Sequence, residues 1–319
     1  MYSNFGMKLF SGTAHPLLAR QIASSLGVKL ADVNVTAFPD GETFVKINEN
    51  IRGEDVYIIQ PTCPPTNHNL MELMIIVDAA KRASAGRINA VIPFFGYARQ
   101  DRKDQPRVPI TAKLVADLLS AAGVDRVVTM DLHAAQIQGF FNIPVDHLFA
   151  KPIIIRELRE RFGDRCSDLT VVSPDVGGVK MARAYSDALG AQLAIVAKHR
   201  VSATEVEAMQ VIGNVEGRDV VLIDDMTETA GTLCAAAEIL KKGGAKRIFA
   251  AVSHAVIGEL GHKRIEESAI EEVITTDSTP VEARGKVSPV SIAAILGQAI
   301  QRIHNGESVT SLFDIDAEG

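Results

Sequence analysis

Residues 219–232 restrict the fold of this chain more than any other stretch. They include a wholly apolar run, residues 220–223, rich in β-branched side chains, which is typical of a central strand covered on both faces. Two acids, Asp224 and Asp225, stand where that strand is expected to end. Small residues follow and lead into an apolar-periodic segment that stops at Gly243. The sequence therefore predicts a buried strand, an acidic turn and a helix in direct succession.

The junction between this strand and this helix is suited to binding an anion. Backbone N–H groups, two hydroxyls and the positive end of a helix dipole converge on Thr229, Ala230, Gly231 and Thr232. Acids beside an anion repel it unless they accept hydrogen bonds from hydroxyls or face a cation. A sugar phosphate meets both requirements, with its phosphate on the loop and its ring hydroxyls on the acids. The alternative interpretation is a solvated acidic turn before an ordinary helix.

Strand-like and helix-like segments alternate along the whole chain. Strands are expected near residues 8–11, 33–38, 56–60, 90–94, 126–131, 169–173, 193–197, 220–223, 248–253 and 273–276. Helical segments with glycine stops lie between many of them, which indicates parallel sheets with crossovers and an α/β fold. Residues 126–133 and 218–225 are similar apolar strands that end in acidic turns, which suggests duplication. We expect two tandem domains, 1–150 and 151–319, with the C-terminal tail packing on the first.

Composition excludes several classes of protein. The 319 residues are 47% hydrophobic and 23% charged, so both domains can bury a core, and the net charge of −6 argues against nucleic-acid binding. Cys63, Cys166 and Cys234 form no Cys-x-x-Cys pair, which argues against disulfides and structural zinc and favours a reducing cytoplasm. The apolar run at 73–77 is too short to span a membrane. We therefore expect a soluble, cytoplasmic protein.

Two motifs at other strand ends have side chains suited to a nucleotide, and ligands of parallel sheets bind beyond the carboxyl ends of strands. The turn at 38–42 projects Phe38 as a stacking surface for a base, with Asp40 and Glu42 as hydrogen-bond acceptors. The segment 93–104 presents Arg99 and Arg102, whose guanidinium groups suit phosphate oxygens. The alternatives are an ordinary tight turn and a solvated charged loop.

Two further strand ends carry acids and a histidine. Asp131 and His133 are two residues apart and point the same way if the segment is extended, so they would form a Mg²⁺ site beside bound phosphates. Asp175 precedes a pair of glycines that lets the backbone approach a ligand closely. A structural histidine and a simple strand-to-helix turn are the alternatives.

Two cations close the strand at 193–197. Lys198 and Arg200 are expected to face one side at the base of a flap formed by residues 201–209. Cations on a lid that closes over a polyphosphate would exclude water and stabilise charge on the transferred oxygens. The alternative is an exposed cationic strand end. The chain has neither a Gly-x-x-x-x-Gly-Lys-Ser/Thr loop nor a Gly-x-Gly-x-x-Gly motif, which argues against P-loop kinases and nucleotide-dependent dehydrogenases.

These segments resemble a known family. Residues 224–232 are similar to the 5-phosphoribosyl-1-diphosphate loop of the type I phosphoribosyltransferase fold, except that Glu228 stands where an aspartate is usual. The whole chain resembles the ribose-phosphate diphosphokinases, also called phosphoribosyl pyrophosphate synthetases. The resemblance rests on motifs at residues 38–42, 60–65, 69–73, 97–102, 130–133, 136–141, 173–178 and 308–313. It implies two phosphoribosyltransferase-like domains, each a mostly parallel sheet flanked by helices.

The resemblance implies a reaction and the residues that perform it. With Mg²⁺, the diphosphoryl group of ATP moves to the 1-hydroxyl of ribose 5-phosphate, which gives 5-phosphoribosyl 1-diphosphate and AMP for nucleotide biosynthesis. The positions that match the ATP site are Phe38, Asp40, Gly41, Glu42, Arg99 and Gln100. His133 and Asp175 match the metal site, and Lys198 and Arg200 the catalytic flap. Ribose 5-phosphate would be held by Arg200, Asp224, Asp225, Glu228, Thr229, Ala230, Gly231 and Thr232.

The resemblance also implies regulation and assembly. Family members typically form homohexamers with phosphate activation and ADP inhibition at a subunit interface. The positions expected there are Arg52, Gln138, Asp146, Ser308 and Phe313. Asn50, Ala135 and His147 replace the more familiar Ser, Ser and Asn, so the response to phosphate and ADP stays open.

Two other functions compete with this interpretation. A phosphoribosyltransferase that consumes the same diphosphate would share the loop at 224–232 but would not need the two nucleotide motifs. A non-catalytic relative that regulates active subunits is disfavoured because Lys198, Arg200 and both acids of the loop are retained.

Overall fold

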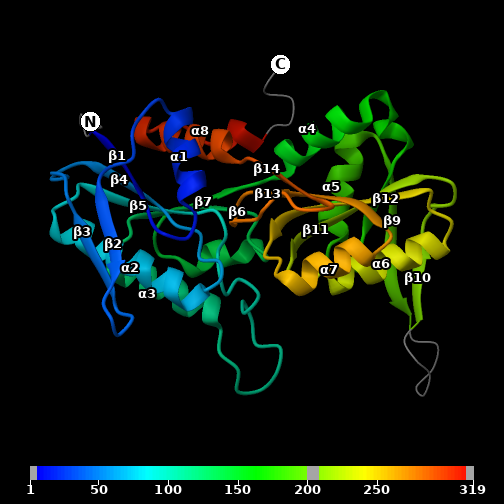
Figure 1. The fold of residues 1–319 in the computed structure, drawn as a ribbon, viewed down its shortest axis with the longest axis horizontal. Coiled ribbons are helices and arrows are strands. Elements are labelled where there is room, and N and C mark those ends of the chain that lie inside the picture. The colour runs from blue at the N-terminus through cyan, green and yellow to red at the C-terminus, as the bar shows by residue number, and fades with distance from the viewer. Residues whose placement is uncertain (1–5, 200–207, 314–319) are drawn as a thin grey trace. The chain divides into compact units, whose positions relative to one another are not determined.

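The structure is a computed structural model that describes residues 6–199 and 208–313. Figure 1 shows helices and strands in alternation along the chain. Contacts divide the chain into two compact units. The first contains residues up to Phe149 with 278–280 and 291–313, and the second contains 150–277 and 281–290. Residues 291–313, from the end of the second domain expected at 151–319, group with the first unit, on which the C-terminal tail was expected to pack.

The first unit is built on a five-stranded parallel sheet in the order β1-β4-β5-β6-β7. Its strands are β1 (Met7–Ser11), β4 (Asp55–Ile59), β5 (Arg87–Ile92), β6 (Arg126–Met130) and β7 (Val145–Leu148). Every residue of β4 is buried, as a continuous apolar run in a sheet covered on both faces should be. The strands β2 (Val33–Ala37) and β3 (Thr43–Ile47) form a separate antiparallel hairpin.

Helices cover both faces of this sheet (Figure 1). Helices α1 (Pro16–Ser25) and α8 (Ala293–Asn305) lie on one face, and α2 (Thr66–Arg82) and α3 (Thr111–Ala122) on the other. The two helices of the first pair approach closely at Gly297, where a Cβ would lie 2.3 Å from the Ser25 hydroxyl. The helix near the C-terminal end of the described chain is thus part of the first unit's packing.

The second unit contains a seven-stranded sheet in the order β10-β9-β8-β11-β12-β13-β14. Its strands are β8 (Thr170–Ser173), β9 (Gln192–His199), β10 (Ala208–Ile212), β11 (Asp219–Thr227), β12 (Arg247–Ala255), β13 (Ile270–Thr276) and β14 (Val287–Val290). All pairs are parallel except β10 with β9. This sheet and that of the first unit confirm the α/β class with mostly parallel strands.

Helices also cover the second sheet. Helices α4 (Lys151–Phe162) and α5 (Val179–Leu189) lie on one face, and α6 (Gly231–Lys242) and α7 (Glu259–Glu267) on the other (Figure 1). Short 3-10 turns occur at η1 (Ala135–Phe140), η2 (Gly163–Asp168) and η3 (Thr310–Phe313).

Among the described helices, none combines the length and apolarity needed to cross a membrane.

Candidate functional site

The two acids lie inside β11 and not after it. The sequence predicted that the strand would end at Ile223, but it continues to Thr227 because β12 extends alongside, pairing Asp224 with Val252 and Thr227 with Ala255. The apolar part of β11 is buried, whereas Asp224 and Asp225 are half-buried. Since β11 lies between β8 and β12, both acids occupy the carboxyl edge of the sheet near its centre.

Negative charge is concentrated at this edge. Burial raises the pKa of Asp224, and the charges of Asp225 and Asp175 act in the same direction. The Asp225 N–H donates to Oδ1 of Asp224 at 2.9 Å and partly opposes that rise. A carboxyl group with a raised pKa gains most from partners that favour its charged form, namely hydroxyl donors or a cation.

The loop that follows, residues 228–232, has the backbone geometry of an anion site. Ala230 is buried and has left-handed dihedral angles, φ 54° and ψ 13°, just before α6 begins at Gly231. Its carbonyl accepts the first helical bond, from the Cys234 N–H at 2.9 Å. No side chain caps the helix, so the first amides of α6 are available to a ligand.

Asp175 follows β8, the neighbour of β11. Its Oδ1 accepts hydrogen bonds from the amides of Gly177 at 2.8 Å and Gly178 at 2.9 Å, and its carbonyl accepts one from the Ser173 hydroxyl at 2.7 Å. These bonds form the strand-to-helix turn that was the alternative interpretation. They also fix an exposed carboxylate at the edge that carries Asp224, so the turn and the ligand role are compatible.

The cationic flap is described only in part. The backbone of Lys198 belongs to β9, where it pairs with Met209 of β10. Strand β9 adjoins β8, so the position of Lys198 is at the end of a strand two places from β11. Arg200 lies outside the described residues.

In the first unit, the segment at 38–42 forms the turn of the β2–β3 hairpin. The Phe38 N–H donates to the Glu42 carbonyl at 2.8 Å, and the Gly41 N–H donates to the Phe38 carbonyl at 2.9 Å. Asp40 Oδ1 accepts from the Glu42 N–H at 3.1 Å, and Gly41 has a φ of 92°. The tight turn expected from the sequence is confirmed.

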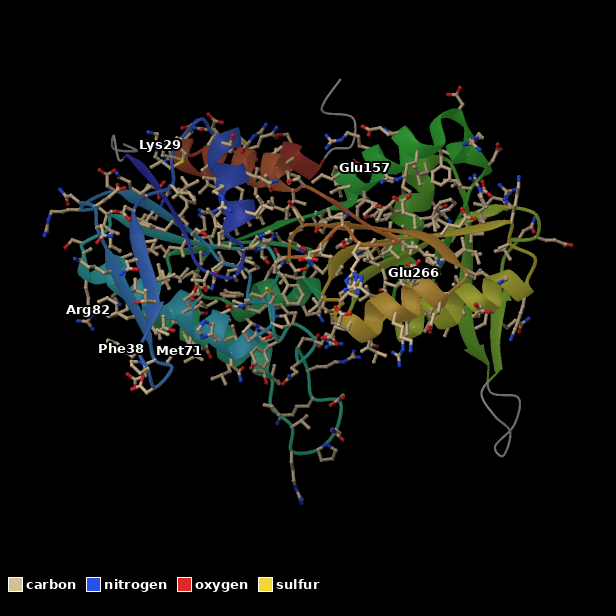
Figure 2. All side chains as sticks on the ribbon, in the orientation of Figure 1. Lys29, Phe38, Met71, Arg82, Glu157 and Glu266 are labelled. Atoms are coloured by element: carbon tan, nitrogen blue, oxygen red, sulfur yellow. The ribbon has the colours of Figure 1, made fainter. Side chains whose placement is uncertain are left out.

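This turn exposes an aromatic ring, which Figure 2 shows at one end of the hairpin. Half of the Phe38 surface is exposed, and the ring packs edge-on against Phe44 with centroids 5.5 Å apart. A ring supported on one side and open on the other is suited to stacking. Arg99 and Gln100 lie on the exposed segment that follows β5, where the Ala112 N–H donates to the Gln100 carbonyl at 3.2 Å.

The extended segment that would make Asp131 and His133 point the same way is not present at Asp131. Asp131 has a left-handed φ of 37°, so the segment after β6 is not extended and the alternation of side chains is broken. Asp131 is buried, whereas His133 is exposed. Across residues 6–199 and 208–313, no three histidine, cysteine or acidic side chains are grouped so as to hold a metal ion.

The expected regulatory residues whose side chains are described lie at three places within the first unit. Asp146 and Ser308 line one cavity of about 290 Å³, in which Arg126 forms an ion pair with Asp146 at 2.6 Å. Gln138 lies beside His147, with 3.2 Å between Nε2 and Nδ1. Arg52 instead donates to the Ser84 hydroxyl at 3.2 Å. The side chain of Phe313 lies outside the described part of the chain.

Helix α7 contributes a residue that the sequence did not reveal. Nη1 of Arg264 donates to the carbonyl of Thr229 at 3.1 Å, so this helix contacts the 228–232 loop. The two residues are 35 positions apart, and no local sequence motif links them.

Two family models match most of the chain. Residues 7–123 match the family model of the N-terminal domain of ribose phosphate pyrophosphokinase, and residues 194–314 match that of the phosphoribosyl synthetase-associated domain. The chain is 54% identical over 314 residues to the ribose-phosphate pyrophosphokinase of Vibrio cholerae, covering 97% of this chain and 99% of the relative. This chain belongs to the ribose-phosphate pyrophosphokinase family.

Other relatives extend the same result. The ribose-phosphate pyrophosphokinase of Burkholderia pseudomallei is 52% identical over 98% of this chain and 99% of its own length. The crystal structure of phosphoribosylpyrophosphate synthetase from Mycobacterium smegmatis is 40% identical, with a TM-score of 0.89 over 94% of this chain and 99% of that one. The fold and family expected from the sequence are confirmed, and the protein is an enzyme of the ribose-phosphate pyrophosphokinase type.

Proposed function

We propose that this pyrophosphokinase transfers the diphosphoryl group of ATP to the 1-hydroxyl of ribose 5-phosphate in a Mg²⁺-dependent reaction. The products are 5-phosphoribosyl 1-diphosphate and AMP. The observation that carries the proposal is the succession of Asp224, Asp225 and the start of α6 at the carboxyl edge of the second sheet. That succession offers acceptors for sugar hydroxyls beside amide donors for a phosphate.

The sugar phosphate is placed by complementary chemistry. Its 5-phosphate accepts hydrogen bonds from the amides of the 228–232 loop and from the hydroxyls of Thr229 and Thr232, aided by the α6 dipole. Its ring hydroxyls donate to Asp224 and Asp225, which stabilises the charged form of the carboxyl whose pKa is raised. Both contacts orient the 1-hydroxyl for attack.

The nucleotide is bound by the first unit's motifs. The exposed ring of Phe38 stacks on the base, and the carboxylates of Asp40 and Glu42 accept its amino or hydroxyl protons. Arg99 contacts phosphate oxygens through its planar donors. Gln100 and Gly41 are the remaining residues of the proposed ATP site, and Gly41 allows the turn its conformation.

Phosphoryl transfer needs positioning and charge neutralisation more than covalent help. In this proposal Lys198 and Arg200 bring positive charge to the β-phosphate as the sugar 1-hydroxyl attacks and AMP leaves. The proposed role of these two cations rests on the sequence alone.

The acidic edge is compatible with Mg²⁺. Burial and the neighbouring carboxylates raise the pKa of Asp224, and a cation bound beside it would favour its charged form. Asp175 would hold the ion at this edge together with phosphate oxygens, since Mg²⁺ is commonly bound by one or two side chains plus substrate phosphates. His133, in the first unit, is the other metal-site position that the family resemblance implies. When bound, Mg²⁺ supplies positive charge that offsets the charge of the polyphosphate. Asp224 and Asp225 orient the sugar.

The test is a product analysis. The protein is incubated with ATP, ribose 5-phosphate and Mg²⁺, and AMP is quantified alongside 5-phosphoribosyl 1-diphosphate. Equal amounts of both products, each dependent on ribose 5-phosphate, support the proposal. Formation of ADP in place of AMP contradicts it. A phosphoribosyltransferase would make no AMP from this mixture, and a regulatory relative would bind the substrates without turnover.

We also propose that the enzyme is a homohexamer that responds to phosphate and ADP. The cavity lined by Asp146 and Ser308 supports an effector site, because it also contains the cationic side chains of Arg87 and Arg126. Activity titrated against phosphate and ADP tests the response, and light scattering after gel filtration tests the assembly. A flat titration would show that the replacements at Asn50, Ala135 and His147 have removed the regulation.

A further inference from the structure

Helix α7 packs directly against the 228–232 loop. A Cβ built on Gly261 would lie 2.7 Å from the carbonyl oxygen of Glu228, so the helix backbone touches the loop backbone there. One turn later, Nη1 of Arg264 donates to the carbonyl oxygen of Thr229 at 3.1 Å and lies 3.4 Å from the Cβ position of Gly231. Residues three apart share a helix face, so a single face of α7 contacts two successive loop carbonyls.

This contact determines where the loop amides point. In a planar trans peptide, the C=O and the N–H point in opposite directions. The carbonyls of Glu228 and Thr229 are turned toward α7, so the amides of Thr229 and Ala230 are turned away from it. Ala230 is left-handed and α6 starts directly after it, an arrangement in which successive amides form an anion-binding concavity. The hydrogen bond from Arg264 therefore orients part of the proposed phosphate site.

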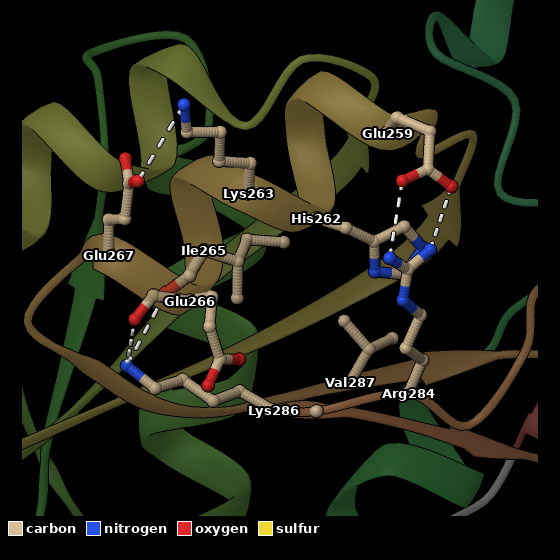
Figure 3. Close-up of a pocket in the computed structure, with 10 residues that line it drawn as sticks. Glu259, His262, Lys263, Ile265, Glu266, Glu267, Arg284, Lys286 and Val287 are labelled. Carbon is tan, nitrogen blue, oxygen red and sulfur yellow. Dashed lines mark hydrogen bonds and ion pairs between the residues drawn. The ribbon is translucent and has the colours of Figure 1, made fainter.

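Helix α7 is itself held at both ends, as Figure 3 shows. Near its start, Glu259 forms two hydrogen bonds with Arg284, at 2.7 and 3.2 Å. Near its end, Nζ of Lys286 donates to the carbonyls of Glu266 at 2.9 Å and Ser268 at 3.1 Å. These contacts surround a cavity of about 320 Å³ between α7 and residues 284–287. A helix fixed in this way can support the loop without shifting.

We propose that Arg264 is a positioning residue for the sugar-phosphate substrate. By holding the Thr229 carbonyl on the α7 side, it keeps the amides of Thr229 and Ala230 directed at the 5-phosphate. Arg264 contacts the 228–232 loop and affects the substrate only through that loop. The proposal deepens the function proposed above and rests on it.

The test compares Michaelis constants for the two substrates. In Arg264→Ala, the KM for ribose 5-phosphate should rise about tenfold. This is the low end of the range expected when a hydrogen bond that involves a charged group is lost, because Arg264 is exposed. The KM for ATP should stay within about twofold, because the nucleotide motifs belong to the other unit. Arg264→Lys keeps one donor and should recover part of the affinity.

The neighbouring Lys263 provides the matched control. It is exposed on the same helix and lies 3.9 Å from Glu267. Lys263→Ala removes the same charge, so its KM for ribose 5-phosphate should equal that of the unaltered protein. A thermal unfolding scan of each variant accompanies the kinetics, because a merely structural role would lower the unfolding temperature and leave the ratio of the two KM values unchanged.

The kinetic results of the two variants decide the role of Arg264. A selective rise in the KM for ribose 5-phosphate in Arg264→Ala, absent from Lys263→Ala, supports the positioning role. Equal changes in both Michaelis constants, or the same change in both variants, overturn it. The function itself is read from the unaltered protein, since failure of that protein to form AMP rejects the proposed reaction independently of Arg264.

Discussion

His304 Nδ1 lies 2.8 Å from Oδ2 of Asp55, and this contact joins α8 to the start of β4 across 249 residues of sequence. Asp55 is buried and also accepts hydrogen bonds from Arg87 Nε at 2.7 Å, Asn89 Nδ2 at 2.8 Å and the Tyr57 hydroxyl at 3.0 Å. Arg87 donates in addition to the carbonyl of Ile303. A single buried carboxylate thus anchors α8 to the first sheet.

Asp55→Ala should be among the most destabilising single changes in the first unit. It leaves the partly buried Arg87 without its carboxylate, and breaking a buried ion pair in this way costs about 3–5 kcal/mol. Urea unfolding followed by circular dichroism measures the loss. The control is Asp78→Ala, which removes an exposed i,i+4 pair with Arg82 and should unfold at nearly the same urea concentration. Equal midpoints for both variants would contradict the anchoring role.

The same carboxylate should make stability depend on acid pH. Burial acts to raise the pKa of Asp55, but hydrogen bonds from Arg87 and His304 outweigh it and lower that pKa below the ordinary 3.8. A lowered folded-state pKa stabilises the fold above the unfolded value, and the stabilisation is lost as pH falls through the folded value. Unfolding temperatures measured between pH 6 and pH 3 should therefore fall more steeply for the unaltered protein than for Asp55→Asn.

The sheets could be predicted from the sequence because their strands are continuous apolar runs. Residues 220–223 are one such run, and the structure places them in a fully buried part of β11. The end of that strand could not be predicted, because Asp224 and Asp225 are poor strand formers and the strand continues through them by the pairing of Asp224 and Thr227 with β12. The contact between His304 of α8 and Asp55 also had no local signal, since the two residues are 249 positions apart.

The candidate site likewise has features that the sequence predicted and features that it did not. The turn at Gly41 was predictable from residue chemistry, and the loop before Gly231 was predictable from the small residues that open a helix. The left-handed φ of Asp131 was not, because a residue other than glycine rarely adopts it and no turn motif marks this position. Arg264 was missed for another reason, since its partner Thr229 is adjacent only after α7 has packed on the loop.

Phe38→Ala should weaken nucleotide binding selectively. Loss of a stacked ring costs about 1–3 kcal/mol, so the KM for ATP should rise by about tenfold or more. The KM for ribose 5-phosphate should not change, and because the ring is half exposed the protein should remain folded. Steady-state kinetics with each substrate varied in turn provide the measurement. Phe44→Leu is the control, because it keeps an apolar support beside Phe38 while leaving the ring itself in place.

Lys198→Ala should reduce kcat by about 10³-fold, the effect expected when a cation that neutralises a transferred phosphoryl group is lost. The circular dichroism spectrum should be unchanged, since the backbone pairing of β9 with β10 does not depend on that side chain. Lys242→Ala, which removes an exposed lysine from the last turn of α6, serves as the control. Near-normal turnover in Lys198→Ala would remove this residue from the catalytic flap.

Asp224→Asn should stabilise the ligand-free protein while impairing binding of ribose 5-phosphate. Burial and the charge of Asp225 raise the pKa of Asp224 in the folded state, so the folded protein holds a proton that the unfolded chain releases. Its stability therefore decreases as pH rises from the unfolded value toward the folded one. The amide removes that ionisation, and the variant should be more stable by about 1–2 kcal/mol at pH 8.5 but not at pH 4. Urea unfolding at both pH values measures this difference, and calorimetry with ribose 5-phosphate measures the lost affinity. If the variant and the unaltered protein differed in stability by the same amount at both pH values, and bound ribose 5-phosphate equally well, this carboxyl would neither carry the raised pKa nor contact the sugar.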